Sequence, residues 1–413
     1  MISRRLWPGL GSLFLVALLS GCAATTNVPA PSPPLLLISM DGFRWDYLDR
    51  YPEQTPNLHA LRKSGVGAKA LIPVFPSQTF VNHYSIVTGL YPSHHGIINN
   101  VFFDAELSEF FRYKTPSANK DPRWWKGEPI WITAVRQGKR SACYFWPGSE
   151  VAMHGLRATI SKPFDYGIPF EKRADELFGW LRLPAEQRPA ITTFYFEETN
   201  KAAHYFGIDS PELIAAVAKL DAQIGSIVDR AKREGLALNI VVVSDHGFVE
   251  TSGEKRTTML DDFVDFERVQ VDFDGPVTGL RPLDGNVDSV VQRLSSLPPQ
   301  YKIYRSAELP AHLHVTPGAR VPPIWIIPDP GWRIQRRSTF LAVKDNLLKG
   351  DHGFDPASES MHGILIASGP SFKTNGDFGR VENIHVYNLL CAALGLRPAA
   401  NDGDNRLIRA MLR

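Results

Sequence analysis

Ile240-Val-Val-Val-Ser-Asp-His-Gly247 is an apolar run that ends abruptly in polar residues, and this form decides the fold. Runs of the same form cover residues 35–40, before Asp41, and residues 191–196, before Glu197. A fourth apolar run covers residues 364–367. Strands of parallel sheets that are buried on both faces are short and uniformly apolar. Because open α/β sheets bind ligands at the carboxyl ends of their strands, the pattern predicts a mostly parallel sheet with a site at that edge.

Helical patterns lie between these runs. Thr55 and Pro56 begin one that ends near Gly65, with a cap, a proline in the first turn and a terminal glycine. Pro211 begins a longer one, in which apolar residues recur at helical spacing as far as Ile227. Alternating strands and helices favour an α/β fold in three layers, with the sheet covered on both faces.

The domain organisation follows from a change in pattern after residue 250. Residues 251–344 contain short strand-like pieces broken by Gly and Pro, such as 269–273 and 323–327. We interpret this segment as a small inserted α+β subdomain. The catalytic α/β domain is then expected to comprise residues 35–250 and 345–413.

The N-terminal segment has the form of an export signal. Arg4 and Arg5 precede a short apolar run at 13–19, too short to span a bilayer, which leads to Leu-Ser-Gly-Cys22. That tetrapeptide resembles a bacterial lipoprotein processing box, and the alternative is an ordinary cleaved signal with a chance cysteine. Residues 23–34 are Pro-rich and predict a flexible tether. We therefore expect residues 1–22 to be a lipoprotein signal peptide. The mature protein would be anchored to the membrane through Cys22, on the periplasmic or outer surface of the cell envelope.

Net charge and cysteine content argue against a nucleic-acid partner and against a disulfide framework. The chain has 413 residues and a formal net charge of +2, so no strong field favours nucleic acid, and no nucleic-acid partner is expected. Three cysteines, one of them in the leader, do not make a disulfide framework. Cys143 and Cys391 lie in apolar surroundings and are expected to be buried thiols.

Carboxylate, amide and imidazole side chains gather near the ends of the predicted strands. Such groups are the usual ligands of zinc and similar ions, and burying an unpaired carboxylate is costly. Each residue alone would more often be a satisfied surface or core group, but together they predict a metal site. The set comprises Asp41, Asn200, His204, Asp245, His246 and His352.

Thr79 lies where a helical pattern begins, within residues 75–84. A hydroxyl at a helix start is surrounded by free backbone N–H groups that favour an anionic phosphate, and a metal would lower its pKa. Ser and Thr also fill the N-cap routinely. From local sequence alone, the plain N-cap is favoured over the nucleophile.

Six ordered motifs resemble the nucleotide pyrophosphatase/phosphodiesterase family of the alkaline phosphatase superfamily. Together they span about residues 35–400, which makes the resemblance specific. The motifs are LLLISMDGFRWDYL (35–48), TPNLHALRKSGV (55–66), FPSQTFVNHYSIVTGLYPSHHGIINN (75–100), GEPIWITAVRQGKRSACYFWPGSEV (127–151), VVVSDHGFVE (241–250) and GDHGFDPASESMHGILIASGPSFK (350–373).

The resemblance implies an alkaline-phosphatase-like three-layer sandwich and two divalent metal ions, with Zn²⁺ the expected ion. Asp41, Asp245 and His246 would hold the ion that also binds the nucleophile. His204 and His352 would hold the second ion, which activates water.

The resemblance also implies the roles of the residues that meet the substrate. Thr79 would be the nucleophile and form a covalent phospho-threonine intermediate. Asn100 would hydrogen-bond a phosphate oxygen. Phe80 and Tyr166 would be the aromatic pair that sandwiches a nucleotide base, with core packing as the alternative. The implied reaction is hydrolysis of a phosphodiester or pyrophosphate bond in a small molecule such as a nucleotide.

One departure from the family pattern concerns the second metal. The family has an aspartate where this chain has Asn200, although the spacing of four residues to His204 is kept. We expect a filled but weaker site, and Glu197, Glu198 or a neighbour could instead substitute. The alternatives are a phosphomonoesterase of the same superfamily and a weakly active or inactive relative that only binds ligand. A sulfatase is disfavoured, because no C/S-x-P-x-R motif surrounds Thr79.

Overall fold

The computed structural model describes residues 1–2 and 32–413. Residues 3–31, which include Cys22, the rest of the predicted signal peptide and most of the predicted tether, lie outside the described residues. Within residues 32–413, no helix combines the length and the apolar character that crossing a membrane requires.

An eight-stranded sheet forms the centre of the molecule, in the order β18-β2-β17-β8-β1-β7-β5-β6. All neighbouring strands run parallel except β17, which is antiparallel to both β2 and β8. The strands are β1 (Leu35–Met40), β2 (Val66–Ile72), β5 (Ser141–Tyr144), β6 (Ile160–Lys162), β7 (Ile191–Phe196), β8 (Asn239–Val243), β17 (Leu365–Ser368) and β18 (Gly376–Glu382).

The mostly parallel sheet is thereby confirmed, but the fourth apolar run has the opposite direction to the other three. Leu365, the first residue of β17, pairs with Val243, the last residue of β8. The chain therefore enters β17 from the edge at which β1, β7 and β8 end. His352, which precedes this strand, consequently lies at the same edge as the residues that follow the parallel strands.

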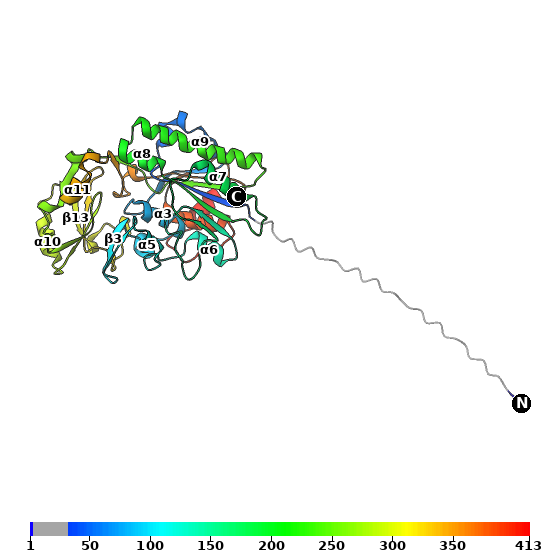
Figure 1. The fold of residues 1–413 in the computed structure, drawn as a ribbon, viewed down its shortest axis with the longest axis horizontal. Coiled ribbons are helices and arrows are strands. Elements are labelled where there is room, and N and C mark those ends of the chain that lie inside the picture. The colour runs from blue at the N-terminus through cyan, green and yellow to red at the C-terminus, as the bar shows by residue number, and fades with distance from the viewer. Residues whose placement is uncertain (3–31) are drawn as a thin grey trace. The chain divides into compact units, whose positions relative to one another are not determined.

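Helices cover both faces of the sheet. Alternate residues of β1 point to opposite sides, so Leu36 and Ile38 join one core cluster while Leu35 and Leu37 join the other. The first cluster includes α2 (Pro56–Ser64), α7 (Phe170–Leu181), α8 (Glu198–Phe206) and α9 (Pro211–Arg233), and the second includes α3 (Thr79–Thr88), α6 (Ile130–Arg136) and α12 (Val386–Ala393). In Figure 1, α7, α8 and α9 lie on the opposite side of the sheet from α3 and α6, which confirms the three layers.

Both predicted helices are confirmed, with one difference in how the first is capped. Thr55 precedes α2, but its hydroxyl donates to the Tyr51 carbonyl and makes no cap hydrogen bond. The Asp221 carboxylate of α9 instead accepts from the backbone N–H groups of Asn57 and Leu58. The cap thus comes from a neighbouring helix, which ties α2 to α9 on this face of the sheet.

Part of the expected insertion forms a second, antiparallel sheet with its own small core. Its strands, in the order β11-β12-β14-β13, are β11 (Val269–Phe273), β12 (Thr278–Pro282), β13 (Tyr301–Arg305) and β14 (Ile324–Pro328). The strand predictions at 269–273 and 323–327 are confirmed, the latter with a shift of one residue. Helix α10 (Val287–Leu294) contributes Leu294 to this core, beside Leu280 and Ile326.

Both cysteines in the described residues, Cys143 and Cys391, are free and buried, as expected. Burial raises the pKa of each thiol to about 12, so neither is a thiolate near neutral pH.

Candidate active site

A first cluster, Asp41, Asp245 and His246, forms where two neighbouring parallel strands end. Asp41 follows β1 directly and Asp245 follows β8 by two residues. The His246 Nε2 atom lies 3.1 Å from Asp245 Oδ2 and 3.4 Å from Asp41 Oδ1. All three side chains are buried. The carboxyl edge of the sheet therefore supplies two carboxylates and one imidazole at a single point.

Thr79 faces this cluster from the start of α3. The N-cap is Gln78, so Thr79 is the first helical residue and the plain N-cap alternative for Thr79 is wrong. Its Oγ1 lies 3.3 Å from His246 Nε2. The helix ends at Gly89, whose φ of 70° suits a left-handed C-cap. The Thr79 hydroxyl therefore lies both at the positive end of a helix dipole and beside the first cluster.

Two residues that the sequence analysis did not single out support the first cluster from behind. The Tyr195 hydroxyl donates to Asp41 Oδ2 at 2.5 Å. His83 Nδ1 lies 3.2 Å from Asp245 Oδ2, and its Nε2 lies 2.8 Å from Ser39 Oγ. Asp41 Oδ1 and Asp245 Oδ2 are nevertheless buried, and neither has a hydrogen-bond partner among the residues that the structure describes. Buried acceptors of this kind are what a cation would satisfy.

The charges of the first cluster are unfavourable without a counter-ion. Burial raises the pKa of Asp41 well above its usual range, and the adjacent Asp245 carboxylate raises it further. Burial acts on Asp245 in the same direction, but the imidazoles of His246 and His83 outweigh it and hold the pKa of Asp245 below its usual range. The two carboxylates thus compete for the same positive charge, and a divalent cation would relieve both.

A second cluster, His204, Asp351 and His352, lies beside the first. His204 comes from α8, and the other two lie in and just after β16 (Gly350–Asp351), which pairs with β9 (Val249–Glu250). One ligand atom of each of these three residues lies within 4.8 Å of the others, and the same holds for the first cluster. The rings of His246 and His352 are stacked with centroids 3.6 Å apart, so the two clusters adjoin.

The three imidazole rings share one hydrogen-bonding arrangement, which suits metal binding. The Nδ1 atoms of His204, His246 and His352 lie 2.9–3.0 Å from the backbone oxygens of Gly350, Gly247 and Ser77 respectively. An Nδ1–H bond to a carbonyl leaves Nε2 as the free lone pair, the arrangement typical of metal-bound histidine. Burial lowers the pKa of His352 to about 3 and of His204 to about 4, and the neighbouring imidazoles add to both shifts.

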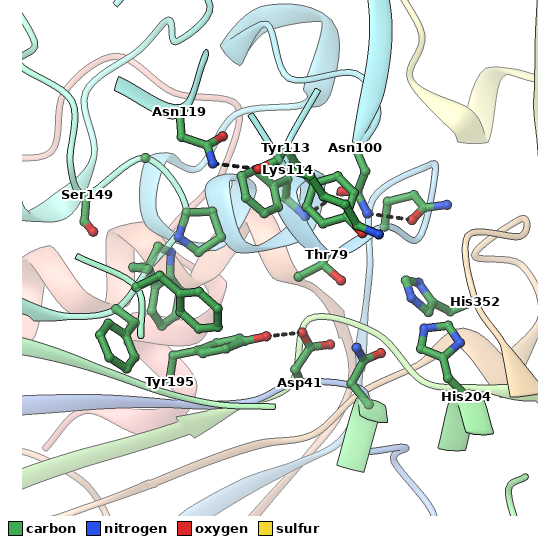
Figure 2. Close-up of a pocket in the computed structure, with 18 of the residues that line it drawn as sticks. Asp41, Thr79, Asn100, Tyr113, Lys114, Asn119, Ser149, Tyr195, His204 and His352 are labelled. Carbon is green, nitrogen blue, oxygen red and sulfur yellow. Dashed lines mark hydrogen bonds between the residues drawn. The ribbon is translucent and has the colours of Figure 1, made fainter. Parts of the chain in front are cut away.

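The structure brings together all six residues of the predicted metal set. Asn200 belongs to α8 with His204, and its Oδ1 is buried without a hydrogen-bond partner. In Figure 2, Asp41, Thr79, His204 and His352 face one common space. The buried, unpartnered oxygens and the three free Nε2 atoms fit divalent cations.

A cleft of about 810 Å³ opens over both clusters. Its lining includes the aromatic residues Phe80, Tyr113, Phe164 and Tyr195. Tyr166 is not part of this lining and is 73% exposed. Phe164, two residues earlier, does line the cleft.

Asn100 makes hydrogen bonds to both chain neighbours of Thr79. Its Oδ1 accepts from the Phe80 N–H at 3.0 Å, and its Nδ2 donates to Gln78 Oε1 at 3.0 Å. The amide is therefore held against the first turn of α3, at the margin of the cleft.

A family model described as type I phosphodiesterase / nucleotide pyrophosphatase matches residues 35–355. The chain belongs to this family. It is 37% identical over 409 residues to the venom phosphodiesterase CdcPDE of Crotalus durissus collilineatus, covering 95% of this chain and 48% of that protein. It is 36% identical over 393 residues to human ectonucleotide pyrophosphatase/phosphodiesterase family member 1, covering 92% and 42%. The chain thus spans about half the length of the curated relatives it matches.

Solved structures of the family match most of the chain. Murine ectonucleotide pyrophosphatase/phosphodiesterase 5 aligns with a TM-score of 0.86 and 33% identity, over 92% of this chain and 100% of that one. An inactive threonine-to-alanine variant of the same mouse protein, in complex with AMP, aligns with a TM-score of 0.86 and 32% identity over the same shares. The predicted fold class and family resemblance are thereby confirmed.

Proposed function

We propose that this family member is a metal-dependent phosphodiesterase or nucleotide pyrophosphatase in which Thr79 is the nucleophile. The observation that carries the proposal is the position of Thr79 Oγ1, 3.3 Å from His246 Nε2 at the first turn of α3. Hydrolases of this kind need a hydroxyl that is close both to a cation site and to donors for phosphate oxygens. The enzymatic activity of the named relatives supports the same conclusion.

The residues present fit two divalent cations, with zinc favoured by their mixture of imidazole and carboxylate donors. Asp41, Asp245 and His246 would hold one cation, and His204 and His352 would hold the other. When bound, such ions lower the pKa of a coordinated hydroxyl or water and stabilise negative charge on the attacking and leaving oxygens.

The protein's own groups orient the two steps. In the first, Thr79 Oγ forms a bond to phosphorus as the bond to the leaving oxygen breaks, which yields a phospho-threonine ester. In the second, water hydrolyses that ester and returns the threonine hydroxyl. In this proposal the start of α3 and the amide of Asn100, which is bonded to the first turn of α3, would contact the non-bridging oxygens.

The aromatic lining of the cleft supports a nucleotide substrate. A mouse relative has been solved with AMP. In this chain we assign base stacking to Phe80 and Phe164, because both line the cleft whereas Tyr166 does not. Base–aromatic stacking contributes about 1–3 kcal/mol per base and tolerates different bases. Phe164→Ala is therefore expected to raise KM for a nucleotide diester about fivefold to a hundredfold. Tyr166→Ala serves as the exposed control, and equal effects of the two substitutions would contradict the assignment.

The test of the reaction is hydrolysis of bis(4-nitrophenyl) phosphate against 4-nitrophenyl phosphate in the presence of zinc. We expect the diester to be the better substrate, and Thr79→Ala to lower its turnover by about a thousandfold or more while the thermal unfolding curve is unchanged. Faster hydrolysis of the monoester would favour the phosphomonoesterase alternative. Undiminished turnover in Thr79→Ala would remove Thr79 from its role, and no release from either substrate would favour the ligand-binding alternative.

The export proposal rests on the N-terminal sequence alone. We propose that residues 1–22 direct export and that Cys22 becomes a lipidated N-terminus. Metabolic labelling with a fatty acid is expected to mark the wild-type chain and not a Cys22→Ala variant; label on both would contradict the anchor.

A further inference from the structure

The second cluster lacks the charge of the first. Asp41 and Asp245 give the first cluster two buried carboxylates, whereas position 200 offers the second cluster only a neutral amide. A divalent cation held by two imidazoles and an amide oxygen alone would lack any anionic ligand, which weakens binding. A carboxylate from elsewhere in the chain would supply the missing negative charge.

Asp351 is the carboxylate placed to fill this need. It is 5% exposed, and its Oδ1 lies 4.0 Å from His204 Nδ1. A ligand atom of Asp351 lies within 4.8 Å of ligand atoms of both His204 and His352. Tetrahedral ligands of one zinc ion, at about 2.0–2.2 Å from it, are roughly 3.4 Å apart. To complete the set, the ligand atoms would have to approach one another by up to about 1.4 Å, and the Asp351 carboxylate would have to rotate from the Nδ1 side of the His204 ring toward its Nε2.

The two glutamates nearest in sequence to Asn200 are less suitable. The Glu198 carboxylate lies 3.1 Å from Lys219 Nζ, on the neighbouring helix α9. Glu197 is not among the residues that line the cleft. Neither belongs to either cluster of candidate metal ligands within residues 32–413. These positions, which the sequence offered as substitutes, are therefore disfavoured against Asp351.

Arg333 holds the other side of the Asp351 carboxylate. Its Nη1 lies 2.7 Å from Asp351 Oδ2, yet that oxygen has no well-directed hydrogen bond. The Asp351 Oδ1 atom accepts only from the backbone N–H of His352, at 2.9 Å. The arginine and a cation at His204 would thus be two positive charges that share one carboxylate, and each weakens the hold of the other.

We propose that Asp351 supplies the carboxylate ligand of the second cation, in place of the side chain at position 200, and that Arg333 competes with the cation for it. This inference rests on the proposed two-cation function. It assigns Asp351 a direct bond to the cation, which distinguishes it from a residue that merely orients His204 or His352.

The experiment measures zinc bound by the purified full chain, by elemental analysis after dialysis and by calorimetric titration of zinc alone. Asp351→Asn is expected to weaken the second binding event at least about tenfold and to leave the first unchanged. Adding Asn200→Asp to that variant should restore the lost affinity, since a carboxylate returns to the site. Arg333→Gln should tighten the second binding event. The matched control is Asp272→Asn, which removes a buried carboxylate that pairs with Arg281 at 2.9 Å in the second sheet.

Cobalt substitution supplies a readout that an orienting role would not move. Loss of a directly bound carboxylate should change the visible absorption of Co²⁺ in the second site of Asp351→Asn, and Asn200→Asp should bring back a spectrum of the original intensity. Two zinc ions bound by Asp351→Asn with wild-type affinities, or no restoration by Asn200→Asp in a variant with wild-type thermal stability, would overturn the inference. A wild-type chain that binds no zinc would instead contradict the proposed function itself.

Discussion

The two clusters of the candidate site are built in different ways although they adjoin. The first takes Asp41 and Asp245 from the ends of β1 and β8, at the centre of the sheet, where both carboxylates are about 1% exposed. The second takes its ligands from helix α8 and from the short β16 segment, and the His204 side chain is 18% exposed. One cluster is therefore placed by the sheet, and the other by elements that pack against the sheet's edge.

This difference explains which cluster tolerates a change of ligand. In the first cluster, Tyr195 holds the Asp41 carboxylate and His83 holds the Asp245 carboxylate, each at the end of a central strand. In the second, a carboxylate on a different element lies close enough to compensate for Asn200. Charge follows the same division, because the first cluster carries two carboxylates and the second shares its single one with Arg333.

The largest expected effect comes from the first cluster. Asp245→Asn removes a charge that the buried pair needs to hold a cation, and it leaves an amide between His246 and His83. We expect kcat/KM for the diester to fall by about a thousandfold or more, which corresponds to about 4 kcal/mol or more of transition-state stabilisation. Steady-state kinetics at saturating zinc checks this, with zinc content measured in parallel. A variant that kept most of its activity would end the distinction between the clusters.

The positions of the carboxylates were predictable from sequence for a simple reason. Parallel strands end at one edge, so residues that follow apolar runs, such as Asp41 and Asp245, must converge. The direction of β17 was not predictable, because an apolar run carries no information on the path by which the chain returns to the sheet. The inserted subdomain at 251–344 stays a prediction, although the second sheet lies within it.

Side chains whose roles depend on tertiary contacts were not predictable from the sequence, each for a physical reason. Tyr195 lies in a uniformly buried strand, and only the direction of its side chain reveals the bond to Asp41. Phe164 lines the cleft and the expected Tyr166 does not, although the two positions are only two residues apart in a segment without periodicity. Asp351 is visible beside His352, but its pairing with Arg333 depends on a tertiary contact.

A change in the second cluster is expected to have an effect of intermediate size and to strengthen zinc binding. Asn200→Asp alone adds a carboxylate four residues before His204, in the same helix. We expect the second zinc ion to bind about tenfold to a hundredfold more tightly. Turnover should then persist at lower free zinc, which a titration with a chelator would measure. The control is the same titration on Asp272→Asn. Unchanged chelator sensitivity, with two ions already bound tightly by the wild type, would show that the second cluster is not the weaker one.

The smallest expected effect tests whether the hydrogen bond that Tyr195 makes to Asp41 affects metal binding at the first cluster alone. Tyr195→Phe removes the hydrogen bond to Asp41 Oδ2 and little else, because the ring remains. That bond lowers the pKa of Asp41, so its loss makes a proton compete better with the cation for the carboxylate. We expect zinc to bind to the first cluster about tenfold more weakly at most, with the deficit growing as pH falls and the second binding event unchanged.

Tyr84→Phe is the matched control for this change, because the Tyr84 hydroxyl is buried but donates to Met153 Sδ, away from both clusters. Calorimetric zinc titrations of the two variants at several pH values separate the possibilities. If Tyr84→Phe behaved like Tyr195→Phe, the effect would come from general loss of packing. If Tyr195→Phe weakened both binding events equally, the two clusters would share one support. The two clusters would then differ only in the number of their carboxylates, and not in how the sheet and its edge hold their ligands.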